Sequence, residues 1–274
     1  MYKIGLSTCA KGAPEYLFED YKKAGIEAME ISVGIELAEV LDYKRIAQYA
    51  EKYGVNLWSF HIPFGPFEKI DISSTDKALR KSTIKYISEL IKRVSVSGID
   101  KYVIHPSGEP MEESERAEKI KCAQESLSEL SKIAGEYGGV IAVENLPRTC
   151  LGRDSDDILK LIEADPALRV CFDTNHLLKE DPIEFIHKVG SKIVTTHVSD
   201  YDFVDEKHWL PGEGKMDWQA IYKSLQEVGY NGVWLYELDF KAPVHMQRSR
   251  SLNCEDFARN AKEIFNNQPL TIVK

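Results

Sequence analysis

The sequence predicts a single α/β domain built as a (β/α)8 barrel, the TIM-barrel architecture. Strand-like and helix-like segments alternate along all 274 residues, and there are eight such pairs. Strict alternation indicates parallel strands joined by right-handed crossovers. An open doubly wound sheet would alternate in the same way. The count of eight favours the closed barrel, which typically needs about 250 residues. The segment after the first strand, Ser7-Thr-Cys-Ala-Lys-Gly12, also lacks the GxGxxG fingerprint of nucleotide-binding open sheets.

Short apolar runs rich in β-branched residues predict the strands. In chain order they lie at 4–8, 28–32, 55–61, 102–105, 140–144, 169–173, 193–197 and 233–237. Helical periodicity predicts the helices between and after them, at 14–24, 43–53, 76–97, 113–137, 154–165, 182–189, 217–228 and 255–265. Several of these helices end at glycine, as helices commonly do. No linker or low-complexity segment divides residues 1–274, so we expect one domain.

Composition and charge narrow the function classes. The chain has 35 Lys and Arg against 44 Asp and Glu, a formal charge of −9, which disfavours a nucleic-acid partner. No apolar run approaches the ~20 residues that span a bilayer, and the N-terminus enters a strand directly, so we expect neither a membrane partner nor a signal peptide. The five cysteines form no CxxC pair. This fits a reduced, cytoplasmic location.

Four potential metal ligands stand at the ends of the last four predicted strands. They form the strand-end quartet: Glu144, Asp173, His197 and Glu237. In a closed parallel barrel the C-terminal strand ends meet at one mouth. Like charges so close together would repel unless a cation or protons intervene. The sequence therefore predicts a divalent metal ion, and the imidazole favours Mn²⁺, Zn²⁺ or Co²⁺ over Mg²⁺.

Further ionisable side chains surround the same mouth. Glu30, His61 and His105 end the second, third and fourth strands, His176 follows the sixth, and His208 lies in the long loop at 200–215. We expect these residues to contact the substrate or additional metal ions. Each alone is equally typical of a solvated loop or helix-start residue. Four aromatic residues are candidates for the pocket wall or for the core: Trp58, Phe60, Phe64 and Trp209.

Motifs in the second half of the chain carry a family resemblance. They are Val143-Glu-Asn145, Asp173-Thr-Asn-His176, His197-Val-Ser-Asp200 and His208-Trp-Leu-Pro-Gly-Glu-Gly-Lys-Met-Asp-Trp218. Through them the chain resembles the xylose isomerase-like barrel superfamily, which holds sugar isomerases and epimerases and the DNA-repair enzyme endonuclease IV. The resemblance covers essentially the whole chain. It implies that the quartet binds the metal, that its two glutamates do acid–base work, and that His176 touches the substrate.

The chain also departs from particular members. Ketose 3-epimerases carry a further Glu six residues after the strand-five Glu, where this chain has Cys150, and an Arg six residues after the strand-seven His, where it has Phe203. Conversely, several residues fall where endonuclease IV keeps ligands for additional zinc ions: His61, His105, His176, Glu206 and His208. The resemblance thus allows either one metal ion or several.

The leading hypothesis is isomerisation or epimerisation of a small sugar, keto-sugar or sugar phosphate. Glu144 or Glu237 would remove the proton beside a metal-polarised carbonyl, giving an enediolate, and the other would return a proton. Arg148 and Lys215 are candidates for a phosphate contact. One alternative is an endonuclease IV-like phosphodiesterase with several zinc ions, acting at abasic DNA sites. Another is a barrel that binds a ligand without turnover.

Overall fold

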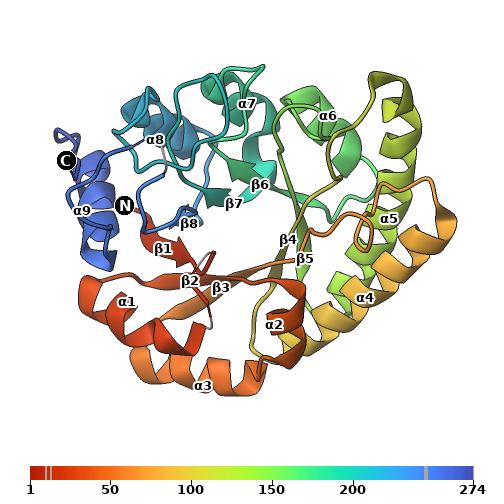
Figure 1. Ribbon diagram of the computed structural model, residues 1–274, viewed down its shortest axis with the longest axis horizontal. Coiled ribbons are helices and arrows are strands. Elements are labelled where there is room, and N and C mark those ends of the chain that lie inside the picture. Colours follow the sequence, from red (N-terminus) through yellow and green to blue (C-terminus); the bar gives the residue numbers. More distant parts are fainter. Residues whose placement is uncertain (10, 13, 244–245, 274) are drawn as a thin grey trace.

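The strands close into a barrel around a central axis (Figure 1). The computed structural model describes residues 1–9, 11–12, 14–243 and 246–273. All neighbouring strands pair in parallel, in the order β7-β6-β5-β4-β3-β2-β1-β8. Their bounds are β1 Lys3–Ser7, β2 Ala28–Ser32, β3 Asn56–His61, β4 Lys101–Ile104, β5 Val140–Glu144, β6 Arg169–Asp173, β7 Ile193–His197 and β8 Val233–Tyr236. The predicted (β/α)8 barrel is confirmed.

Helices surround the barrel and connect its strands (Figure 1). They are α1 Phe18–Ala24, α2 Ile35–Val40, α3 Tyr43–Tyr53, α4 Lys77–Ser95, α5 Arg116–Glu136, α6 Ser155–Ile162, α7 Pro182–Val189, α8 Trp218–Glu227 and α9 Cys254–Phe265. Many of them start where an acidic or amide side chain accepts a hydrogen bond from a free backbone N–H of the first turn. These caps are Asp42, Asp76, Asp154, Asp181, Asp217 and Asn253. None of the helices in the described part of the chain has the length and apolar character to cross a membrane.

Two helical details differ from the sequence prediction. The expected helix at 14–24 is a 3-10 turn, Pro14–Tyr16, followed by α1. The short helix α2 was not predicted. It has six residues and begins after Gly34, which offers no side chain to cap it, so neither a start signal nor a long periodic pattern marks it. Burial of Ala38 in the main core stabilises α2 instead.

The seam between β7 and β8 closes the barrel by an unusual pairing. A single bridge joins Val198 to Tyr236, just beyond the end of β7. Below it, the hydroxyl of Thr196 donates to the carbonyl of Val233 at 3.1 Å and accepts from the amide of Leu235 at 3.4 Å. A side chain thus makes contacts that backbone groups make elsewhere in a sheet.

Small and apolar side chains fill the barrel interior. Ala28, Val233 and Leu235 pack with Trp58, whose indole N–H donates to Thr195 at 3.0 Å. At Gly5 an added Cβ would lie 2.4 Å from the Val233 side chain, so only glycine fits there. Three further interior residues, Val103, Ala142 and Cys171, form a second cluster. With apolar residues below, the inward positions at the strand ends carry the polar side chains, as the alternation of the strands predicts.

Candidate metal centre and active site

The strand-end quartet converges at the mouth of the barrel. Glu144, Asp173 and His197 are the last residues of β5, β6 and β7, and Glu237 directly follows β8. One possible ligand atom from each lies within 4.8 Å of the others. The Nδ1 atom of His197 lies 3.0 Å from a carboxylate oxygen of Glu144 and 3.1 Å from one of Glu237. The geometry is therefore compatible with one shared cation.

Glu30 orients His197 from beneath the site. A carboxylate oxygen of Glu30 lies 3.1 Å from Nε2 of His197 and also accepts a hydrogen bond from the Ser59 hydroxyl at 2.7 Å. With its Nε2 proton directed at Glu30, the imidazole presents Nδ1 to the quartet. A carboxylate behind a ligating histidine is a common feature of metal sites, because it fixes the tautomer and the ring orientation.

Asp173 presents an unpaired oxygen to the centre of the quartet. Its Oδ1 accepts the backbone N–H of Asn175 at 2.6 Å, whereas its buried Oδ2 has no hydrogen-bond partner. Asn145 fixes the backbone of Asp173 from both sides: its amide donates to the Asp173 carbonyl and its oxygen accepts the Asp173 N–H, each at 2.8 Å. A buried oxygen without a partner is costly. A cation at this position would satisfy it, so the donor set fits a divalent metal.

The buried charges of the site favour positive charge beside the carboxylates. Burial alone raises the pKa of Glu144, but His197 and His105 hold it well below its ordinary value. Burial alone lowers the pKa of His61, yet the hydrogen bond to Glu144 raises it to about 9. Burial raises the pKa of Asp173 to about 7 despite the opposing effect of His176. Bound protons or a metal ion would therefore stabilise the buried carboxylates.

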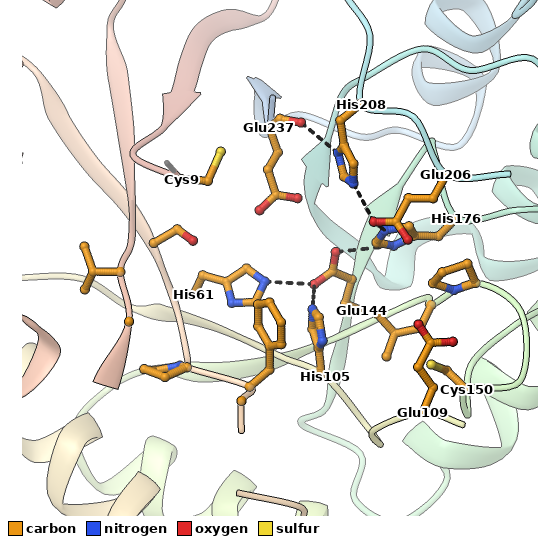
Figure 2. Close-up of a pocket in the computed structure, with 18 of the residues that line it drawn as sticks. Cys9, His61, His105, Glu109, Glu144, Cys150, His176, Glu206, His208 and Glu237 are labelled. Atoms are coloured by element: carbon orange, nitrogen blue, oxygen red, sulfur yellow. Dashed lines mark hydrogen bonds and ion pairs between the residues drawn. The ribbon is translucent and has the colours of Figure 1, made fainter. Parts of the chain in front are cut away.

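Two further groups of possible ligands lie around Glu144, one of the quartet residues (Figure 2). In the first, Nε2 of His61 and Nε2 of His105 lie 3.1 and 3.2 Å from the second carboxylate oxygen of Glu144. In the second, a Glu206 oxygen lies 2.8 Å from Nε2 of His208 and 3.6 Å from Nε2 of His176. Glu144 therefore faces the quartet with one oxygen and the His61–His105 pair with the other.

Backbone carbonyls anchor three of these imidazoles. Nδ1 of His61 lies 3.0 Å from the carbonyl of Ile62, Nδ1 of His176 2.9 Å from that of Asn145, and Nδ1 of His208 3.2 Å from that of Glu237. When each Nδ1 carries the proton and donates, Nε2 is left as the free nitrogen that faces a carboxylate. Such anchoring is typical of metal-binding histidines.

The loop that carries Glu206 and His208 is fastened by the buried Asp200. Its carboxylate accepts hydrogen bonds from four N–H groups, those of Tyr201, Gly212, Met216 and the Trp218 indole, at 2.8 to 3.2 Å. Gly214 packs against this carboxylate so closely that an added Cβ would lie 2.2 Å from its oxygen. The Pro-Gly-Glu-Gly segment is therefore a folded support for the site.

The functional groups open into one cavity of about 750 Å³. Of the expected site residues, its lining includes His61, His105, Glu144, His176, His208 and Glu237. Asp173, His197 and Glu30 are fully buried beneath it. Among the four candidate wall aromatics, only Phe64 is part of the described lining; Trp58 and Phe60 lie in the barrel interior and the main core. Glu109 and Arg148 also line the cavity.

The sequence did not reveal several of these supports. Asn145 and Asp200 lie within the motifs that carry the family resemblance, but no role was expected for either. An Asn directly after a ligand-bearing strand end was the available signal for Asn145. Arg148 was a candidate for a phosphate contact; it instead pairs with carboxylates of Glu109, Asp205 and Glu206. Lys215 does not belong to the described lining.

The fold and the site define the class of this protein: it is a (β/α)8 barrel with a candidate metal centre at the C-terminal ends of its strands. Within that class, the chain belongs to the xylose isomerase-like TIM barrel family, whose family model matches residues 18–252. This confirms the resemblance identified from the motifs.

Particular relatives agree with this assignment. An uncharacterized protein of Methanocaldococcus jannaschii is 28% identical over 244 residues, covering 84% of this chain and 82% of that protein. The inosose isomerase of Bacillus velezensis is 26% identical over 255 residues, covering 88% and 87%. The crystal structure of a D-tagatose 3-epimerase-like protein superimposes with a TM-score of 0.79 at 24% identity, covering 97% and 96%. Sugar isomerases and epimerases are thus among the relatives and structural neighbours.

Proposed function

We propose that the protein is a divalent-metal-dependent isomerase or epimerase acting on a small sugar or related polyhydroxy carbonyl compound, with residues 1–274 as one catalytic domain. The observation that carries the proposal is the placement of Glu144 and Glu237. Both line the cavity, and both lie within 3.1 Å of the same nitrogen of His197. The sugar isomerases and epimerases among the relatives support this reaction class.

The quartet would hold the metal ion, which when bound supplies Lewis-acid polarisation of a carbonyl oxygen. Burial alone would raise the pKa of Glu237, but His197 lowers it to about 2, so this carboxylate is ionised at neutral pH. The ionised form is the one that can accept a proton from the carbon beside the carbonyl.

Glu144 and Glu237 come from β5 and from the end of β8, so they approach the cavity from different strands. One removes the proton and the other returns one. Return to the opposite face of the same carbon gives epimerisation. Return to the neighbouring carbon, together with passage of the hydroxyl proton to the former carbonyl oxygen, gives aldose–ketose isomerisation. His176 and His208 line the same cavity and would bind substrate hydroxyl groups.

Solvent exchange tests the proposal. Metal-loaded enzyme is incubated in heavy water with a panel of ketoses and aldoses, and mass spectrometry and NMR follow deuterium at the carbon next to the carbonyl. The expected result is enzyme-dependent incorporation into at least one sugar. Absence of exchange across the panel, with metal bound, would reject proton-transfer chemistry at this site.

A second candidate is a phosphodiesterase with several metal ions. The specific observation in its favour is that the His61–His105 pair and the Glu206–His208 group adjoin the quartet, giving three potential ion sites that share Glu144 or border it. Nicking of a duplex with one abasic site, combined with three bound ions per chain, would support this function. One bound ion and sugar exchange without nicking would support the isomerase or epimerase.

A further inference from the structure

We propose that the substrate is an unphosphorylated polyhydroxy carbonyl compound that carries an apolar substituent, seated beside the reacting end against Phe64. This inference deepens the proposed isomerase or epimerase function and rests on it. It follows from three properties of the cavity: its size, its apolar side, and the pairing of its arginine, Arg148, with carboxylates.

The cavity is large for a single sugar. Its volume of about 750 Å³ lies in the upper part of the range of roughly 300–1,000 Å³ that is typical for drug-sized ligands. A hexose that reaches the acids and imidazoles would leave much of this space empty. The remaining space is bordered by an apolar wall, formed by Val33, Leu37, Pro63, Phe64, Phe67, Leu146 and Pro147. A ligand that fills the cavity must therefore present apolar surface.

The apolar wall is already in place and begins at the candidate metal centre. The ring of Phe64 stacks on the ring of His105 with centroids 4.1 Å apart, yet 46% of Phe64 remains exposed. His105 in turn lies 3.2 Å from Glu144. Phe67 packs on the backbone of Gly108, where an added Cβ would lie 2.5 Å from its ring. When the carbonyl of the sugar lies near Glu144, an apolar substituent of that sugar would therefore pack against the ring of Phe64.

The charge of the cavity disfavours a phosphate group. Arg148 is the only lysine or arginine in the described lining. Its guanidinium already pairs with three carboxylates, at 3.0 Å from both Glu109 and Asp205 and 2.9 Å from Glu206. The hydrogen bond to Glu109 leads the contacts that raise the pKa of Arg148. Phosphate recognition uses free guanidinium or ammonium donors, and this one is occupied.

The usual phosphate position of the fold is also acidic here. Barrel enzymes often bind phosphate with the loops after β7 and β8. In this chain the loop after β7 brings Asp205 and Glu206 toward Arg148, and the loop after β8 places Asp239 in the cavity lining. The nearby ammonium group of Lys11 is held by the carbonyls of Ser7, Cys9 and Leu238 at 2.9 to 3.0 Å. An anionic substituent would meet carboxylates at this edge.

A matched substrate series tests the inference. Metal-loaded enzyme is given a free ketohexose, its terminal phosphate ester and its terminal benzyl ether, and kcat/KM is measured by deuterium exchange. We expect the benzyl ether to exceed the free sugar roughly ten-fold or more, the order expected for burying a phenyl group. We expect the phosphate ester to be the poorest of the three. A phosphate ester that reacts best, or a benzyl ether no better than the free sugar, would overturn the inference and leave the proposed function intact.

Two variants of α2 locate the effect. Leu37→Asp places a carboxylate in the apolar wall, whereas Val40→Asp makes the same change at a residue on this helix that is 74% exposed and outside the cavity lining. Leu37→Asp should bring the ratio of benzyl ether to free sugar down to about one, and Val40→Asp should keep the parent ratio. Circular dichroism checks folding. If Leu37→Asp does not fold, Phe64→Ala replaces it and should lower the same ratio.

Binding affinities measured by calorimetry distinguish failure of the proposed function from failure of the apolar subsite. If no compound exchanges but the benzyl ether still binds roughly ten-fold more tightly than the free sugar, and Leu37→Asp removes this difference, the proposed function is rejected and the apolar subsite stands. If the benzyl ether neither exchanges nor binds more tightly than the free sugar, the apolar subsite is rejected as well.

Discussion

The Oε1 atom of Glu144 lies 3.0 Å from Nδ1 of His197, although the two residues are 53 positions apart in the sequence. This contact joins a candidate base to a candidate metal ligand. Replacing Glu144 by Gln keeps the shape of the side chain but removes the charge and the ability to take up a proton. We expect turnover of an exchanging sugar to fall about 10²–10⁴-fold, the usual contribution of a general base. Deuterium exchange under saturating sugar measures it.

A matched control distinguishes this loss from a general charge effect. Glu227→Gln makes the same change in an exposed pair with His187, outside the described cavity lining. Glu227→Gln should react at the parent rate. Equal activity of Glu144→Gln and the parent enzyme would remove Glu144 from the chemistry.

Asp173→Asn should lower the affinity for divalent metal ions. The substitution turns the carboxylate of Asp173, whose Oδ2 is buried without a hydrogen-bond partner, into an uncharged amide. In the parent protein, metal at about 100 times its Kd should stabilise the fold by about 2.7 kcal/mol. We expect the rise in Tm on adding Mn²⁺ or Zn²⁺ to shrink or disappear in Asp173→Asn. The Tm of the metal-free variant should not fall, because a desolvated carboxylate is removed. A metal-induced rise as large as in the parent protein would contradict this role.

Asp200→Asn should destabilise the loop that carries Glu206 and His208. The carboxylate of Asp200 accepts four N–H groups, and an amide nitrogen in place of one oxygen would meet N–H donors and leave them unpaired. Each buried unpaired group costs about 1–3 kcal/mol. Urea denaturation should show a loss of that size. Asp202→Asn is the control: this partly exposed residue accepts the N–H of Val204 through one oxygen, which the amide retains.

Asp256 should make stability depend on pH at the start of α9. It accepts hydrogen bonds from Arg250, Arg259 and the backbone of Asn253. Burial opposes its ionisation, but the hydrogen bond with Arg250 leads the contacts that lower its pKa from 3.8 to about 2. The ionised form therefore stabilises the fold above about pH 4, and this contribution is lost as the pH falls through 2.

Comparison with Asp256→Asn measures this contribution. At pH 7 the variant should unfold with a free energy lower by about 2 kcal/mol, the equivalent of the shift in pKa. The difference between the two proteins should narrow from pH 4 downward. A difference that stays constant between pH 7 and pH 2.5 would show that the ionisation of Asp256 is not responsible.

The sequence was sufficient for the barrel and for the meeting of the quartet, because both depend on local patterns. Alternating apolar runs place Glu144 and His197 at strand ends, and parallel strands bring those ends together. Of the apolar wall, the sequence offered Phe64 as a candidate but not Leu37, because the position of Leu37 depends on α2, which has no capping signal. The partners of Arg148 come from segments 39 and 57 positions away, and no local pattern encodes such contacts.

The seam at Thr196 would connect the integrity of the barrel to the retention of a cation held by the quartet. His197 follows Thr196 on β7, and Glu237 follows the strand that the Thr196 hydroxyl contacts. Fluctuations that separate β7 from β8 would pull these two ligands apart. Ion release to a chelator would then report on the opening of the barrel seam. Thr196→Val should accelerate this release, although the hydroxyl of Thr196 hydrogen-bonds to backbone groups of β8 and not to the quartet.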